Sequence, residues 1–206
     1  MKTKATLCAL IATASVSTGA TTINIRNFSA ATVGVPIVTL TGAAQDQTTF
    51  FANPGYFSSS IDFAATTFTA IQSAFVSIDN SPLTGGSRSG LFTGQTFNGA
   101  LPSGFFAKDA YIVVANNSNF ASATLFAVFN AGVKFTTPDA LGNSSQTLDG
   151  ANVVFGTVRS VTTQPTGVTN ANFTNGVVLV ASQVPEPSSA LLGAVGILGL
   201  LRRRRN

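Results

Sequence analysis

Ala110-Tyr111-Ile112-Val113-Val114-Ala115 is the stretch that best indicates how this chain folds. Its β-branched and aromatic side chains are the kinds that strands favour. Four further runs have the same character: Val33 to Leu40, Ala123 to Phe129, Val153 to Val161 and Val177 to Ala181. We therefore expect several short strands.

Turn-forming residues separate these runs. They are Asn53-Pro54-Gly55, Ser81-Pro82 with Gly85-Gly86, Asn116-Asn117-Ser118, Thr137-Pro138-Asp139, Gly142-Asn143 and Asn175-Gly176. Glycine, proline and asparagine favour turns because each accepts backbone angles that a turn requires. Short strands punctuated in this way predict an all-β fold, and we expect an antiparallel β-sandwich, jelly-roll-like or immunoglobulin-like.

Two segments depart from this pattern. Apolar side chains at intervals of three, four and three predict one short helix near residues 64–78; they are Phe68, Ile71, Phe75 and Ile78. The segment from Leu83 to Gly104 is rich in glycine, serine and threonine. We expect it to form a loop over the sandwich or a connection between sheets.

The aromatic composition bears on ligand binding. The chain has 17 phenylalanines, two tyrosines and no tryptophan. Phenylalanine has no polar group and mostly fills cores, whereas sugar-binding faces often use tyrosine or tryptophan. Tyr111 lies in an apolar run and is expected in the core. Tyr56 follows Pro54-Gly55 in an expected turn, so it is the candidate for contact with a glycan.

Several kinds of catalysis are excluded by composition. The chain has no histidine, and its one cysteine, Cys8, lies near the N-terminus. A Ser-His-Asp triad and histidine metal sites are thus ruled out, and we expect no cofactor, no metal and no enzymatic activity. A hydrolase built on paired aspartates is the less favoured alternative. Four aspartates stand beside turn-type residues, where Asx-turns and capping explain them: Asp46, Asp79, Asp139 and Asp149.

The net charge of +4 comes from the two ends of the chain. Six of the eleven basic residues lie there: Lys2, Lys4, Arg202, Arg203, Arg204 and Arg205. Between Thr21 and Ser182 there are five basic and six acidic residues, with no basic stripe. Binding to nucleic acid is therefore not expected.

The N-terminus has the three parts of a secretory signal peptide. Lys2 and Lys4 are positively charged, Ala5 to Ala14 is apolar, and Thr18-Gly19-Ala20 is a suitable cleavage site. Residues 1–20 are thus expected to be removed, which makes Thr21 the first residue of the mature chain.

The C-terminus combines a rigid motif, an apolar segment and a block of positive charge. Pro185-Glu186-Pro187 precedes the apolar stretch from Ala190 to Leu201, and Arg202-Arg203-Arg204-Arg205 follows. Residues 188–201 would span ~21 Å as a helix, short of the ~30 Å hydrocarbon core of a bilayer. Snorkelling arginines and local thinning of the bilayer make a short transmembrane helix feasible. The four arginines set the membrane topology, because positive charge keeps the C-terminus in the cytoplasm.

These residues resemble the PEP-CTERM sorting signal of bacteria. The resemblance implies an exosortase, an integral-membrane enzyme that recognises such tails and processes them near the Pro-Glu-Pro motif. Proteins of this kind typically occur in bacteria that build exopolysaccharide, biofilm or floc material. The two prolines stiffen residues 184–187 into an extended strand that a groove can bind at low entropic cost.

The expected organisation has three parts. Residues 1–20 are a signal peptide, residues 21–182 an exported β-rich domain, and residues 183–206 the sorting tail. We expect a non-enzymatic protein of the cell surface or extracellular matrix, associated with exopolysaccharide. Its partners are the exosortase-like enzyme, the inner membrane before processing, and exopolysaccharide. The alternative is a carbohydrate-binding module with Tyr56 at the site.

Overall fold

The computed structural model describes residues 20–28, 34–78, 83–84, 88–139, 143–166, 168 and 172–181. Within these ranges the chain is built mainly from short strands, with one short α-helix and two 3-10 turns. The prediction of an all-β fold is therefore confirmed. No helix in these ranges is long and apolar enough to cross a membrane. The expected transmembrane helix and the signal peptide before Ala20 lie outside the described residues.

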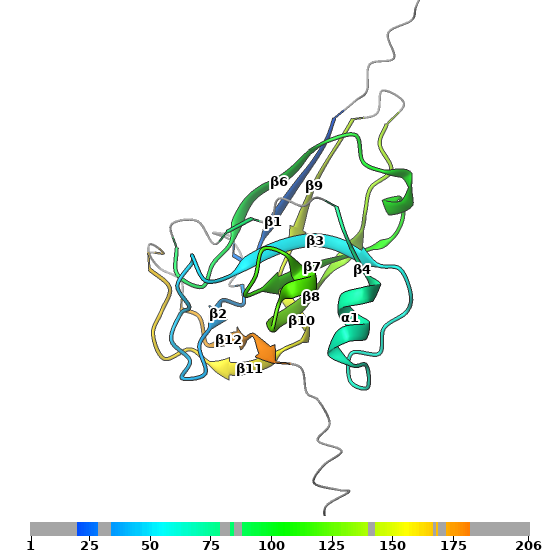
Figure 1. The fold of residues 1–206 in the computed structure, drawn as a ribbon. Helices are drawn as coiled ribbons and strands as arrows, with labels where there is room; N and C mark the ends of the chain where they lie inside the picture. The colour runs from blue at the N-terminus through cyan, green and yellow to red at the C-terminus, as the bar shows by residue number, and fades with distance from the viewer. Residues whose placement is uncertain are drawn as a thin grey trace, which may run out of the picture.

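A seven-stranded sheet forms the centre of the molecule (Figure 1). Its main path runs β10-β8-β7-β3-β4, with β13 paired to β8 and β5 paired to β3. All of its strand pairs are antiparallel. The strands are β3 (Phe51–Phe57), β4 (Phe75–Ser77), β5 (Leu83–Thr84), β7 (Asp109–Ala115), β8 (Leu125–Lys134), β10 (Asn152–Phe155) and β13 (Val180–Ala181).

Strand β7 is the middle of this sheet and is apolar on both sides. Ala110, Ile112 and Val114 join a first core cluster, on one face of the sheet. Val113 and Ala115 belong to a second cluster, on the opposite face. A strand covered on both faces reads as a continuous apolar run, which explains why its sequence does not alternate with polar residues.

Two smaller sheets cover the first face. One has the order β6-β1-β9 and the other β11-β12-β2. Ile23, Ile25 and Leu148 from the former, and Ile37 and Val177 from the latter, pack into the first core cluster. The strands are β1 (Thr21–Arg26), β2 (Ile37–Val38), β6 (Thr93–Gly99), β9 (Ser144–Asp149), β11 (Thr157–Ser160) and β12 (Asn175–Val178).

The predicted antiparallel pairing holds throughout the central sheet, whereas each smaller sheet has one antiparallel pair, β1–β6 or β11–β12, and one parallel pair. Strand β1 pairs parallel with β9, and β12 pairs parallel with β2. Each of these partners comes from a distant part of the chain, and no short sequence signal specifies such a pairing.

The short helix α1 (Phe68–Ala74) covers the second face. Thr67 caps it, because its Oγ1 accepts a hydrogen bond from the Ala70 N–H at 3.3 Å. Phe68 and Ile71 are buried in the second core cluster with Phe126 of β8. The helix predicted near residues 64–78 is confirmed over residues 68–74. It is wrong for residues 75–77, which form β4.

The expected turn at Asn53-Pro54-Gly55 is wrong, because these residues lie inside β3. On one side they pair with β7, as Asn53 with Val113. On the other side β5 pairs only with Phe51 and Ala52, and β4 pairs only from Gly55 onward. Proline is tolerated at this gap because its missing N–H falls where no neighbouring strand requires it.

Five other sequence expectations need correction. The run from Val153 to Val161 divides at Gly156, whose φ of 133° suits glycine, into strands of two different sheets. The run from Val177 to Ala181 divides into β12 and β13. Asn175-Gly176 begins β12 and is not a turn, and the expected loop from Leu83 to Gly104 contains β6. Of residues 34–40, only Ile37–Val38 form a strand.

Candidate functional site

The residues of the sorting tail lie outside the described part of the chain. The sorting motif is Pro185, Glu186 and Pro187, and the residues expected to set the membrane topology are Arg202, Arg203, Arg204 and Arg205. Their roles therefore stay predictions as far as geometry is concerned.

The structure does describe where the tail is attached to the body. Strand β13 is the last described element, and its residues Val180 and Ala181 pair with Phe126 and Leu125 of β8. The last described residues before the tail, Val180 and Ala181, are thus paired with the central sheet.

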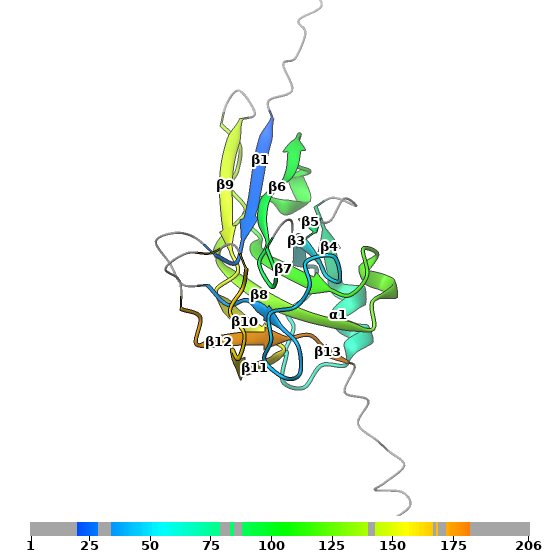
Figure 2. The same cartoon turned by 90° about the vertical axis from the view of Figure 1, so that its left-hand side faces the viewer.

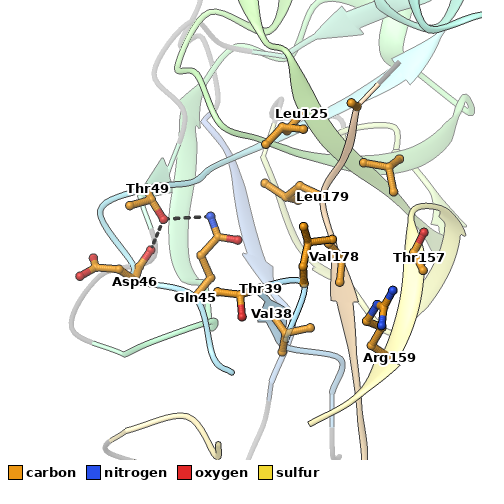
Figure 3. Close-up of a pocket in the computed structure, with 13 residues that line it drawn as sticks. Val38, Thr39, Gln45, Asp46, Thr49, Leu125, Thr157, Arg159, Val178 and Leu179 are labelled. Carbon is orange, nitrogen blue, oxygen red and sulfur yellow. Dashed lines mark hydrogen bonds between the residues drawn. The ribbon is translucent and has the colours of Figure 1, made fainter. Parts of the chain in front are cut away.

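A recess of about 730 Å³ lies beside β13 (Figure 3). We call it the β13 cavity. It is lined by Val38, Thr39, Leu40, Gln45, Asp46, Thr49, Leu125, Thr157, Arg159, Val178, Leu179, Val180 and Ala181. Figure 3 shows the apolar side chains of Leu125, Leu179 and Val178 between a polar group on one side, formed by Gln45, Asp46 and Thr49, and Thr157 and Arg159 on the other. Leu40 in its lining is 73% exposed.

The polar group of the β13 cavity is a turn held by its own hydrogen bonds. Gln45 Nε2 donates to Thr49 Oγ1 at 2.9 Å, and this hydroxyl donates to the Asp46 carbonyl at 2.7 Å. The backbone N–H and the hydroxyl of Thr48 both donate to Asp46 Oδ1. These two bonds lower the pKa of Asp46, because they stabilise its ionised form. The Asx-turn explanation is therefore confirmed for Asp46.

The other described aspartates also have structural partners. Asp62 Oδ1 accepts from the Ala64 N–H at 3.0 Å, and Asp139 Oδ1 accepts from the Asn143 N–H at 2.8 Å. Asp109 pairs with Lys134 at 3.6 Å, and Asp149 pairs with Arg26. The hydrogen bond to Asp149 raises the pKa of the Arg26 guanidinium. Asp79 lies outside the described residues.

Tyr56 lies in β3 and not in the expected turn. Its ring is partly buried and meets the Phe105 ring edge-to-face, with centroids 4.8 Å apart. The ammonium group of Lys108 lies 5.9 Å from the centre of the Tyr56 ring. Much of the ring is therefore engaged within the protein, and its role as a glycan contact stays a prediction.

Tyr111 packs against the second core cluster, as expected from its apolar run. Its ring contacts Phe57 edge-to-face at a centroid distance of 5.0 Å. Burial raises the pKa of the phenol, and the nearby Asp109 charge adds to the effect.

A second recess, of about 430 Å³, lies where α1 and β4 meet the 3-10 turn η2 (Phe120–Ser122). We call it the polar cavity. Its lining is rich in amides and hydroxyls: Asn53, Gln72, Phe75, Ser77, Ser118, Asn119, Phe120 and Ala121. Gln72 on α1 donates from Nε2 to the carbonyls of Phe120 and Ala123, at 2.7 and 3.1 Å. These two bonds fix the helix to η2 and hold the two walls together.

Asn53 is the unusual member of the polar cavity. It is 8% exposed, and its Oδ1 is buried without a hydrogen-bond partner. A second buried asparagine, Asn27, has a fully occupied carboxamide. Its Nδ2 donates to the carbonyls of Val35 and Gly90, and its Oδ1 accepts from the Phe92 N–H. The comparison shows what a purely structural asparagine looks like in this fold.

Metal binding has little support from the described side chains. Within the described ranges, no group of three or more aspartate, glutamate, histidine or cysteine residues is arranged to hold a metal ion.

Comparisons with known proteins identify the tail. The model of the PEP-CTERM protein-sorting motif matches residues 183–205, a range that includes Pro185-Glu186-Pro187 and the four arginines. This motif marks an exported protein that is targeted by an exosortase. No curated protein and no solved structure matches the chain.

Proposed function

We propose that this protein is an exosortase substrate whose β-rich body acts, without catalysis, at the cell surface or in the extracellular matrix. The match of residues 183–205 to the PEP-CTERM protein-sorting motif carries the proposal. In this scheme the signal peptide directs export, and the tail holds the chain in the inner membrane until the exosortase processes it. The mature protein then associates with exopolysaccharide.

The positions of the two ends of the body support two separate processing events. Strand β1 begins at Thr21, and β13 ends at Ala181. These two points lie at opposite ends of the body in both views (Figures 1 and 2). Cleavage after Ala20 keeps every residue of β1 and removes only the Ala20 end of its pairing, where the Ser144 N–H donates to the Ala20 carbonyl at 3.5 Å. Cleavage near residues 185–187 leaves β13 intact.

The contacts of the carboxylates support a non-catalytic role. A pair of catalytic carboxylates must face a substrate across a cleft. The five described aspartates instead cap turns or form ion pairs at separate places on the body. Asp46 is the one acid among the described residues that line the two cavities.

Deletion of residues 183–206, followed by fractionation of the native host, tests the sorting step. The truncated protein should lose the surface location of the full chain. Intact-mass measurement tests processing: the mature protein should begin at Thr21 and lack Arg202 to Arg205. A surface-located protein that retains the arginines would overturn the proposal.

The charge of Glu186 offers a sharper test of recognition. It is the one glutamate in the chain, placed between two prolines. We expect Glu186→Gln to slow processing, because the side-chain shape is kept while the charge that a cationic pocket can bind is lost. The matched control is Ser189→Ala, which alters a nearby residue and should be processed normally. Equal processing of both variants would remove Glu186 from the recognition step.

The association with exopolysaccharide needs its own measurement. Washed matrix from the native host should retain the mature protein, and enzymatic digestion of the polysaccharide should release it. If the matrix still retains the protein after digestion, its partner is a protein or a membrane and not exopolysaccharide.

A further inference from the structure

The polar cavity is unusual because one of its lining residues, Asn53, has a buried Oδ1 without a hydrogen-bond partner. A buried oxygen without a hydrogen bond is a cost to the folded state, and native proteins rarely retain one without reason. Asn53 lies on the helix-facing side of β3, opposite Val113 of the second core cluster. An apolar side chain would suit that position better. The carboxamide is therefore a poor choice for packing alone.

The local fold holds Asn53 at the cavity wall. The gap between β5 and β4 leaves residues 53 and 54 unpaired on one side of β3, and the Ile78 N–H donates across it to the Pro54 carbonyl at 3.0 Å. The close approach of β4 to β3 requires glycine at position 55, because a Cβ on Gly55 would lie 2.3 Å from the Val76 carbonyl oxygen. The Asn-Pro-Gly sequence thus builds a strand that is interrupted at the cavity.

The rest of the lining is formed before any ligand arrives. Gln72 fixes α1 to η2 through its two donated bonds. Asn119 Oδ1 accepts from the Ala121 N–H at 3.1 Å and so shapes η2. Phe75 and Phe120 meet edge-to-face, with centroids 5.4 Å apart, and give the cavity an apolar side. Pre-formed walls lower the entropic cost of binding.

The chemistry of the lining defines the ligand. None of the described residues that line the polar cavity is charged. Phosphates and carboxylates would therefore find no cation among these described lining residues. Amide and hydroxyl groups beside phenyl rings suit a neutral molecule with many hydroxyls and some exposed C–H surface. The volume of about 430 Å³ lies in the lower part of the range for small-molecule sites, ~300–1,000 Å³.

We infer that the polar cavity binds a neutral saccharide unit, with the Asn53 carboxamide as its central hydrogen-bonding group. Rotation of the carboxamide about χ2, a broad torsion, turns the unpaired acceptor toward a sugar hydroxyl. The choice of a saccharide rests on the proposed association with exopolysaccharide. The site itself rests on Asn53 and its surroundings. Tyr56 is not among the residues that line it.

The test titrates the full chain, in mild detergent, with free neutral hexoses and N-acetylhexosamines, and with glucuronic acid as a charged comparison. Binding is followed by ligand-observed NMR and by the side-chain amide signal of Asn53. We expect Asn53→Leu to weaken binding by at least about tenfold. Ser118→Trp should have the same effect, because it fills the cavity from an exposed loop and leaves the sheet untouched. The control is Asn152→Leu, the same substitution at an exposed position of β10.

Each outcome decides the inference. Loss of neutral-sugar binding in Asn53→Leu and Ser118→Trp, with normal binding in Asn152→Leu, supports it. Unchanged binding in the two cavity variants, no binding of any neutral sugar, or a preference for glucuronic acid overturns it. Retention by the host matrix is measured separately. A protein that is retained but binds no sugar at the cavity refutes this site while the proposed function stands.

Discussion

Replacement of Asn53 by leucine should make the protein more stable. Leucine has the same branched arrangement of four side-chain heavy atoms as asparagine, and it removes the buried Oδ1 that has no hydrogen-bond partner. Leaving such a group unsatisfied costs about 1–3 kcal/mol, so its removal should raise the free energy of unfolding by about that amount. For a domain of this size, each kcal/mol shifts Tm by about 2–4 °C. We therefore expect an increase of at least about 2 °C.

The same substitution at Asn27 should have the opposite effect. Asn27 is 2% exposed, and its carboxamide makes three hydrogen bonds to the backbone. Leucine would leave the Phe92 N–H without its acceptor and the Val35 carbonyl without its donor. At about 1–3 kcal/mol for each orphaned group, the loss should be clearly larger than the gain at position 53. The pair thus separates a ligand-facing asparagine from a structural one.

Thermal unfolding of the two variants and the wild type, followed by circular dichroism in the same detergent, measures both changes. A Tm that falls in Asn53→Leu would refute the reasoning, because it would mean that the Asn53 carboxamide stabilises the fold by itself. Equal losses in both variants would have the same meaning. Addition of a binding sugar should raise the Tm of the wild type and leave that of Asn53→Leu unchanged.

Three further results are expected. In a Tyr56→Phe background, tyrosinate absorbance should show Tyr111 ionising above its ordinary pKa of 10.0. Because the folded state favours the neutral phenol, the free energy of unfolding should fall as the pH rises above 10.0 and through the raised pKa of Tyr111. A midpoint at or below 10.0 would contradict the burial of Tyr111. The pKa of Asp46 is lowered from 3.8, so its turn should be intact above that pH and loosen as the pH falls below it; an NMR titration of the Thr48 amide with a midpoint above 3.8 would contradict this. Gly156→Ala should lower the Tm by several degrees, because the φ of Gly156 is 133° and a Cβ there would lie 2.7 Å from Val177 Cγ2. An unchanged Tm in thermal unfolding would show that the connection between β10 and β11 does not require this backbone conformation.

Local pattern predicted those strands that are apolar in themselves. Ala110 to Ala115 became β7 almost unchanged, because both of its faces are buried and its composition signals this directly. Strands with polar or small residues gave no such signal. Strand β6, Thr93–Gly99, reads as a glycine-rich loop, and it is held in place by pairing with β1. Asn53-Pro54-Gly55 carries a strong turn signal that pairing with β7 overrides.

The sorting motif at residues 183–205 could be predicted from the sequence, whereas the polar cavity could not. An exosortase reads the tail as a linear motif, so Pro185-Glu186-Pro187, the apolar stretch and the arginines carry the information in their order. The polar cavity joins Asn53, Gln72 and Ser118, which lie on three elements separated in the sequence. No spacing rule links them, and Asn53 in particular looks like an ordinary turn residue until its burial is known.

By itself, then, the sequence determined the all-β class, one short helix within residues 64–78, and the sorting motif that marks an exported protein. These properties follow from local composition and from a linear signal. Only the tertiary structure decided the parallel pairs β1–β9 and β12–β2, the strand at Asn53-Pro54-Gly55, and the unpaired acceptor of Asn53. The physical reason is that strand pairing and the satisfaction of buried polar groups depend on residues far apart along the chain.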